Sequence, residues 1–140
     1  IVKTAGNPYA HVVLRGSNKA PNYDSENVRY AQSMLREKSL RTNVVIDCSH
    51  GNSNKDYSKQ PEVFEDALKQ IIDGNEGIVG LMIESNINAG NQKLPDRLHG
   101  FNRTLLRYGT SVTDGCIDLE TTEKLVLGTF KRLSTKRTYK

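Results

Sequence analysis

The chain has 140 residues, of which 36% are hydrophobic and 26% are charged. This is the composition of a soluble globular domain and not that of a disordered chain. The length favours a single domain spanning residues 1–140, but it excludes a complete (βα)8 barrel, which usually takes about 250 residues. No apolar run approaches the roughly 20 residues of a membrane-spanning helix, and residues 1–7 lack the pattern of a signal peptide. We therefore expect no membrane association.

The net charge is +4, and the basic excess lies at the carboxyl end. Five of the last ten residues are basic: Lys131, Arg132, Lys136, Arg137 and Lys140. Such an end is typical of a solvated terminus, and without an RNA-binding signature or zinc-finger spacing we expect no nucleic-acid partner. Two cysteines, Cys48 and Cys116, are too few for a disulfide framework, which favours a reducing, cytoplasmic compartment.

Predicted strands and helices alternate along the chain. Residues 10–15 form a short apolar run that predicts a buried strand, and a helix follows over residues 25–38, with Asp24 or Ser25 as its cap. The later elements are strands over residues 43–48, 78–84 and 110–114, a helix that Pro61 begins and Gly74 ends, and a last helix over about residues 120–133. This order predicts parallel βαβ units with helices covering the sheet, as in a piece of a (βα)8 barrel or a small open α/β sheet.

Each predicted strand is followed, at or just past its carboxyl end, by a charged or metal-binding residue. These residues are Arg15, His50, Glu84 and Asp114, which lie 35, 34 and 30 residues apart, about one βα unit per step. In parallel α/β proteins the site lies at the carboxyl ends of the strands, so we expect the four side chains to share one cleft. Imidazole and carboxylates suit a divalent metal, and an arginine fork suits a phosphate or carboxylate.

Each of these residues also has an ordinary structural interpretation. His50 fits a loop or core histidine, Asp114 fits a turn aspartate, and Arg15 fits a partner of a neighbouring acid. Glu84 is less ordinary, because an apolar parallel strand rarely ends in an unpaired acid. The recurrence of all four at one βα period is what favours a shared site over these separate interpretations.

Several segments resemble a known family. Two of them are highly specific: Ser49-His-Gly-Asn-Ser-Asn-Lys55 and Ile83-Glu-Ser-Asn-Ile-Asn88. Together with residues 2–7, 11–16, 21–24, 90–92 and 108–114, they resemble, in order, the carboxyl-terminal part of 3-deoxy-D-arabino-heptulosonate 7-phosphate (DAHP) synthases. The similarity is to the short branch that includes the phenylalanine- and tyrosine-inhibited enzymes of bacteria and fungi.

The resemblance implies the carboxyl-terminal portion of a (βα)8 barrel, about three to four βα units long. It implies condensation of phosphoenolpyruvate with erythrose 4-phosphate and water to DAHP and phosphate, the first step of the shikimate pathway. It further implies that His50, Glu84 and Asp114 bind a divalent metal of the Mn, Fe, Co or Zn type, and that Arg15 holds the phosphate of phosphoenolpyruvate. Feedback inhibition by an aromatic amino acid and assembly into a homo-oligomer are implied as well.

The sequence also departs from the family pattern. The family's fourth metal ligand is a cysteine in a Gly-Pro-Cys-Ser motif, and neither that motif nor the Lys-Pro-Arg-Thr segment occurs in this sequence. Residues 93–106, which include Arg97 and His99, and residues 116–119 differ from the expected pattern. Two hypotheses follow: the chain is the distal part of a synthase, or it is a truncated, catalytically silent relative that binds a full-length partner or is a degenerating copy. The two specific motifs disfavour the related octulosonate phosphate synthases.

Overall fold

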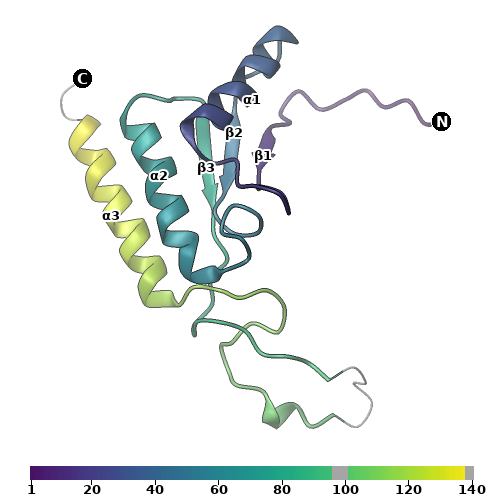
Figure 1. The fold of residues 1–140 in the computed structure, drawn as a ribbon, viewed down its shortest axis with the longest axis vertical. Helices are drawn as coiled ribbons and strands as arrows, with labels where there is room; N and C mark the ends of the chain where they lie inside the picture. The colour runs from purple at the N-terminus through teal and green to yellow at the C-terminus, as the bar shows by residue number, and fades with distance from the viewer. Residues whose placement is uncertain (96–100, 138–140) are drawn as a thin grey trace.

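The computed structural model describes residues 1–95 and 101–137, and it alternates strands and helices as the sequence predicts. Figure 1 shows their arrangement, with an extended amino-terminal arm and a long loop between β3 and α3. The strands are β1 (Val12–Leu14), β2 (Val44–Asp47) and β3 (Ile78–Met82). The helices are α1 (Ser25–Glu37), α2 (Gln60–Ile72) and α3 (Leu119–Arg137), with short 3-10 turns at Tyr57–Lys59 and Arg103–Leu105.

The three strands form a parallel sheet in the order β1-β2-β3. Leu14 pairs with Ile46, and Asp47 pairs with Met82, so the carboxyl ends of the strands lie at one edge of the sheet. The predicted parallel α/β architecture is therefore confirmed. The strands are shorter than predicted, since β1 begins at Val12 and β3 ends at Met82.

Local sequence explains where the first two helices begin. The Asp24 carboxylate caps α1 by accepting hydrogen bonds from the backbone N–H groups of Glu26 and Asn27, at 3.1 and 3.0 Å. Helix α2 has a proline in its first turn, where a missing N–H group breaks no helical hydrogen bond. Both helices agree with the predicted ranges to within one or two residues.

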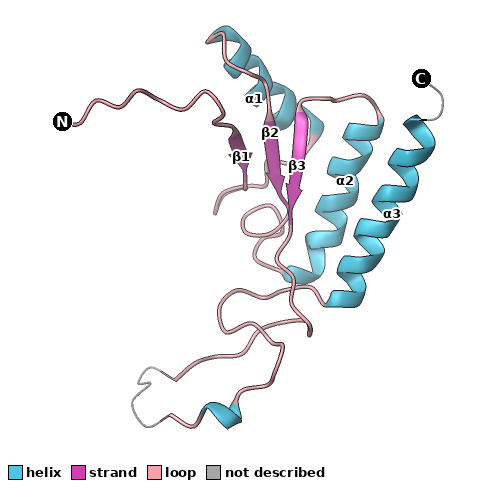
Figure 2. Ribbon diagram, turned by 180° about the vertical axis from the view of Figure 1, so that it is seen from behind, coloured by secondary structure: helices cyan, strands magenta, loops and turns pink. Residues whose placement is uncertain are grey.

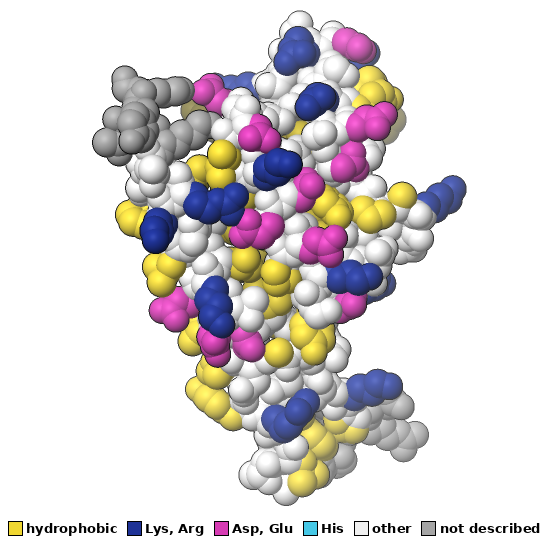
Figure 3. All heavy atoms as spheres, turned by 60° about the vertical axis from the view of Figure 1, so that its left-hand side comes forward, with side chains coloured by type: hydrophobic (Ala, Val, Ile, Leu, Met, Phe, Trp, Pro, Cys, Tyr) yellow, Lys and Arg dark blue, Asp and Glu magenta, His cyan; other side chains and the backbone are white. Residues whose placement is uncertain are grey.

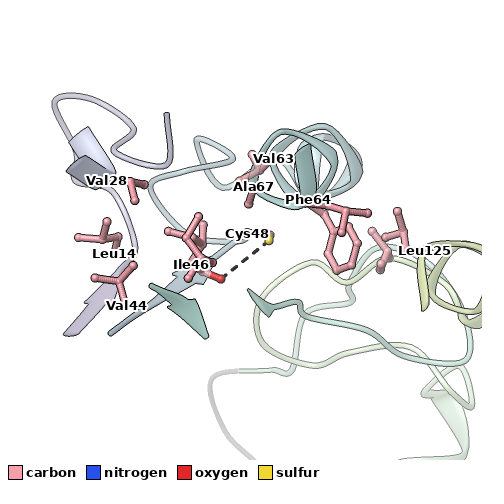
Figure 4. Packing of buried hydrophobic residues seen from close by; sticks show 12 residues of the cluster. Leu14, Val28, Val44, Ile46, Cys48, Val63, Phe64, Ala67 and Leu125 are labelled. Carbon is pink, nitrogen blue, oxygen red and sulfur yellow. Dashed lines mark hydrogen bonds between the residues drawn. The ribbon is translucent and has the colours of Figure 1, made fainter. Parts of the chain in front are cut away.

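The hydrophobic core lies between one face of the sheet and helices α1 and α2. Figure 4 shows Val28 of α1 and Val63 of α2 over the strand residues Leu14 and Ile46. Residues that alternate with these along the edge strands point to the other face, and two of them, Val13 and Val79, are 46% and 52% exposed. Only one face of the sheet is therefore covered by helices in the described part of the chain.

Helix α3 packs on the outer side of α2, away from the sheet (Figure 2). Leu125 is buried and Leu133 packs against the core. Val126 and Phe130, on another side of this helix, are 52% and 70% exposed. No described element lies on their side of α3. Figure 3 shows hydrophobic side chains at the surface in small groups between charged ones.

The fourth predicted strand, over residues 110–114, does not form. Ser111 makes a single bridge to Asn91, and separate bridges join Gly90 to Cys116 and Ser85 to Ile117. Because β3 ends at Met82, its hydrogen bonding to a neighbouring strand does not extend to this segment. The backbone after Ser111 forms bends instead of a strand. Arg97, His99 and Lys140 lie outside the described residues. No helix in the described ranges is long and apolar enough to cross a membrane.

Asn52 connects the carboxyl ends of β1 and β2. Its buried side-chain amide donates hydrogen bonds to the carbonyl oxygens of Leu14 and Asp47, at 3.0 and 2.8 Å. Its Oδ1 accepts from the backbone N–H of Asn22 at 2.8 Å. The last backbone carbonyl groups of the two strands are buried and need hydrogen-bond donors. The Asn52 side chain supplies a donor to both.

Replacing Asn52 with alanine should lower the free energy of unfolding by about 2–4 kcal/mol, because it leaves these buried carbonyl oxygens unpaired. Urea denaturation measures this change. The matched control is Asn18→Ala, which alters an exposed asparagine in the preceding loop and should change stability by less than about 0.5 kcal/mol. Equal effects of the two substitutions would contradict the role of Asn52.

Candidate metal centre

The four residues predicted from the strand ends lie in one cleft. Arg15, His50, Glu84 and Asp114 line a cavity of about 310 Å³ at the carboxyl edge of the sheet. A larger cleft of about 510 Å³ lies between α1 and α2, where its lining residues include Arg29 and Lys69, and it contains none of the four. The predicted convergence of the four residues is thus seen in the structure.

His50, Glu84 and Asp114 each offer one ligand atom, and these atoms lie within 4.8 Å of one another. His50 Nε2 is 3.8 Å from Glu84 Oε1 and 3.9 Å from Asp114 Oδ2. Bonds of about 2.0–2.2 Å to a common ion would place the ligand atoms roughly 3–3.5 Å apart. Small side-chain rotations are therefore enough to close the three groups around a cation, and their nitrogen and oxygen donors suit a divalent transition metal.

His50 is held in an unusual backbone conformation in the loop after β2. Its φ angle is +48°, in the left-handed region that non-glycine residues seldom adopt. Its carbonyl oxygen accepts a hydrogen bond from the Lys55 backbone N–H at 2.7 Å. Its Nδ1 lies 2.8 Å from Asp47 Oδ2, on the side of the ring opposite to the metal-facing nitrogen. The turn that His50 makes therefore directs Nε2 toward Glu84 and Asp114.

Glu84 lies two residues beyond β3, and its backbone is held by Gln60 at the start of α2. The fully buried Gln60 side chain accepts from the Glu84 N–H at 2.8 Å and donates to the Glu84 carbonyl oxygen at 3.3 Å. Burial raises the pKa of the Glu84 carboxyl; the charge of His50 opposes this rise, and the carboxylates of Asp114 and Asp47 add to it. A cation bound among these carboxylates would relieve the repulsion.

Asp114 reaches the cleft from a loop and not, as predicted, from the end of a strand. The backbone N–H of Gly90 donates to the Cys116 carbonyl oxygen at 2.8 Å, and the Cys116 N–H donates to the Gly90 carbonyl oxygen at 3.1 Å. Between Asp114 and Cys116, Gly115 lies so close to Tyr57 that an added Cβ would be 2.7 Å from the ring. The paired loops and this tight contact together place Asp114 beside His50.

The cleft also has a basic side. Arg15 is exposed and, within residues 1–95 and 101–137, has no ion pair with an acid, so the interpretation of Arg15 as a structural partner is not supported. Lys55, which sequence reasoning did not single out, lines the same cleft. The loops that carry Arg15 and His50 touch through their backbones, since a Cβ on Gly16 would lie 2.5 Å from the Asn52 nitrogen. Only glycine allows this approach at a φ angle of +70°.

Two more residues of the site, Asp47 and Gln60, were also missed. Asp47 is the last residue of an apolar strand and is 2% exposed. An acidic residue at the end of a buried strand can be recognised in the sequence, so Asp47 could have been predicted as a site residue. Gln60 carries no comparable signal, because its partner Glu84 is 24 residues away.

The fold and the site define an α/β protein with a polar cleft at the carboxyl ends of parallel strands. The chain belongs to the DAHP synthetase I family, whose sequence model matches residues 2–127.

Individual relatives agree with this assignment. The chain is 52% identical, over 90% of its length, to a Tyr-sensitive phospho-2-dehydro-3-deoxyheptonate aldolase of Enterobacter agglomerans, and covers 56% of that protein. It is 48% identical over 90% of its length to the Tyr-sensitive Escherichia coli protein of the same name, and covers 34% of it. A solved Francisella tularensis aldolase of this name superposes with a TM-score of 0.82 at 43% identity, over 94% of the chain and 36% of that structure. The chain thus spans between about a third and just over half of the length of these relatives.

Cys48 is fully buried beside β2. Burial, with a smaller contribution from the negative charge of Asp47, raises the pKa of its thiol to about 12. We expect a thiol-specific alkylating reagent at pH 8 to leave Cys48 unmodified in the folded protein, since only about one thiol in 10⁴ is then ionised. Mass spectrometry of the labelled peptides tests this, with the urea-unfolded protein as control. Labelling of Cys48 at the same rate in both states would contradict its burial.

Proposed function

We propose that the chain supplies most of the metal centre and one phosphate-binding arginine of a DAHP synthase. The proposed reaction condenses phosphoenolpyruvate with erythrose 4-phosphate and water to DAHP and phosphate, for aromatic amino acid biosynthesis. The observation that carries the proposal is the convergence of the His50, Glu84 and Asp114 ligand atoms within 4.8 Å, in a cleft that Arg15 also lines. Membership of the family and the names of the relatives support it.

His50, Glu84 and Asp114 would hold a divalent ion of the Mn, Fe, Co or Zn type. When bound, such an ion supplies Lewis-acid polarisation of an aldehyde oxygen. Arg15 would bind the phosphate of phosphoenolpyruvate through its planar fork and align it in the cleft. The exposure of the Arg15 side chain and its lack of an ion pair within the described residues support this role, because the guanidinium is then available to a ligand.

We also propose that the three-stranded sheet is part of a (βα)8 barrel. The outer edges of β1 and β3 carry no further strand in the described part of the chain, and Val13, Val79 and Phe130 are exposed. A parallel sheet normally has both faces covered, so further βα units would bury these surfaces and complete the cleft. In such an assembly we expect homo-oligomers and feedback inhibition by an aromatic amino acid; relatives named Tyr-sensitive favour tyrosine.

A chimera tests the proposed function. The segment of the E. coli relative that matches residues 2–127 is replaced by this chain, and phosphate release is measured with both substrates and Mn²⁺. We expect the chimera to release phosphate and the 140-residue chain alone to release none. A folded chimera that binds Mn²⁺ but is inactive would favour the alternative of a catalytically silent relative. Turnover by the chain alone would refute our expectation that its barrel is incomplete.

In the chimera, His50→Ala or Glu84→Ala should abolish phosphate release and weaken Mn²⁺ binding by more than about 100-fold, because each removes a metal ligand. Calorimetric titration with Mn²⁺ measures the affinity. The controls are His11→Ala and Glu62→Ala, which remove exposed residues of the same types. Full activity of both site variants at trace metal concentration would reject the ligand assignment.

For Arg15→Ala in the chimera we expect the apparent KM for phosphoenolpyruvate to rise about 10- to 100-fold, since hydrogen bonds to a charged partner are lost. The KM for erythrose 4-phosphate should change much less. Steady-state kinetics with each substrate varied in turn measures both. Arg29→Ala, an exposed arginine of α1, is the control, and an unchanged KM in Arg15→Ala would show that Arg15 does not bind this substrate.

A further inference from the structure

Asp47 is a buried carboxylate in direct contact with His50. It is 2% exposed at the end of β2, and its Oδ2 lies 2.8 Å from His50 Nδ1. Its other oxygen, Oδ1, accepts hydrogen bonds from the Ser49 backbone N–H at 2.9 Å and from the Ser49 hydroxyl at 2.6 Å. A buried carboxylate is costly unless hydrogen bonds compensate for lost hydration. Both oxygens of Asp47 are compensated, and one of them is directed at the imidazole.

We propose that Asp47 is a positioning residue that fixes the His50 imidazole as the Nδ1–H tautomer and so presents the Nε2 lone pair to a metal ion. This inference rests on the proposed function of the cleft, because it concerns how His50 serves as a ligand. An ionised carboxylate only accepts hydrogen bonds, so the imidazole nitrogen that faces it carries the proton. Nε2, which faces Glu84 and Asp114, is then unprotonated.

The backbone of the loop explains why a positioning residue is needed. His50 has a φ angle of +48°, a strained conformation for a residue with a side chain. The hydrogen bond from the Lys55 N–H to the His50 carbonyl oxygen holds the backbone, but it leaves the ring free to rotate. The bond from Nδ1 to Asp47 is the contact that sets the ring orientation. The Ser49 hydroxyl, 3.0 Å from Nδ1 and bonded to Asp47, closes a small network around it.

Asp47→Asn is the sharpest substitution, because it keeps the shape of the side chain and removes one acceptor. The Ser49 backbone N–H can only donate, so the amide oxygen of the variant must occupy the position of Oδ1 to accept from it. The NH₂ group then occupies the position of Oδ2 and faces His50. The imidazole must then accept at Nδ1 and carry its proton on Nε2. That proton points at Glu84 and Asp114, in the place where a cation would bind.

The first measurement needs no metal and no activity. Nitrogen-15 NMR of the imidazole in the metal-free chain at a pH where His50 is neutral reports which nitrogen carries the proton. We expect Nδ1–H in the wild type and Nε2–H in Asp47→Asn. A free histidine side chain favours Nε2–H, so that tautomer in the wild type would overturn the inference even if the variant failed to fold.

The second measurement is calorimetric titration of the chimera with Mn²⁺ and with Zn²⁺, and the chimera without substitutions is the wild type of this comparison. We expect Asp47→Asn to bind each metal about 10- to 100-fold more weakly than the wild type, and Asp73→Asn, an exposed aspartate after α2, to bind as the wild type does. In a His50→Ala background the Asp47→Asn change should have a much smaller effect, because Asp47 acts mainly through the ring and its charge acts on Glu84 only at a distance. A loss in that background as large as the loss with His50 present would instead indicate a direct effect of the charge and would overturn the inference.

The two proposals fail in different ways. If the wild type binds neither metal, the proposed metal centre is wrong, and the positioning role for a metal ligand fails with it. If the wild type binds metal and Asp47→Asn binds it equally with the Nδ1–H tautomer retained, only the inference about Asp47 is wrong.

Discussion

The side-chain amide of Asn52 is the contact on which the arrangement of the site depends. It bonds to the last carbonyl oxygen of β1 and the last of β2, and the next residues along each chain segment lead directly to Arg15 and His50. Backbone ladders align strands, but they do not reach the loops beyond the strand ends, where functional residues lie. Asn52 continues the alignment one step further, and Gln60 does the same for Glu84 through two hydrogen bonds to its backbone. Two buried side-chain amides thus hold the backbone at and beyond the carboxyl ends of the strands.

Much of this arrangement follows from sequence patterns that act locally or repeat regularly. The caps and apolar faces of α1 and α2 are local, so their positions are predictable to within a residue or two. The spacing of Arg15, His50 and Glu84 follows from the length of a βα unit, and parallel strands bring such residues to one edge. That topological rule gathers these residues without any knowledge of individual contacts.

The remaining features depend on contacts between distant segments. Asp114 shares the cleft because Gly90 and Cys116 pair across the long loop, and single bridges of this kind have no periodic signal. The pairing of Gln60 with Glu84 joins a helix to a strand end in the same way. Val126 and Phe130 of α3 are apolar but exposed, because an apolar residue at helical spacing does not tell how many neighbours its helix has. The roles assigned to the ligands and to Arg15 stay predictions.

The position of α3 has a consequence for local unfolding of the molecule. This helix contacts the rest of the chain mainly through α2, with Leu125 buried and the Arg132–Glu65 ion pair exposed. Elements with few buried contacts detach at a lower free energy than the core does. Asp114 is held by the loop pairing that precedes α3, so fraying of the carboxyl-terminal turns of α3 leaves the ligand cluster intact. The first turn of α3 differs, because its Thr122 hydroxyl is hydrogen-bonded to the hydroxyl of Ser85, the residue after Glu84.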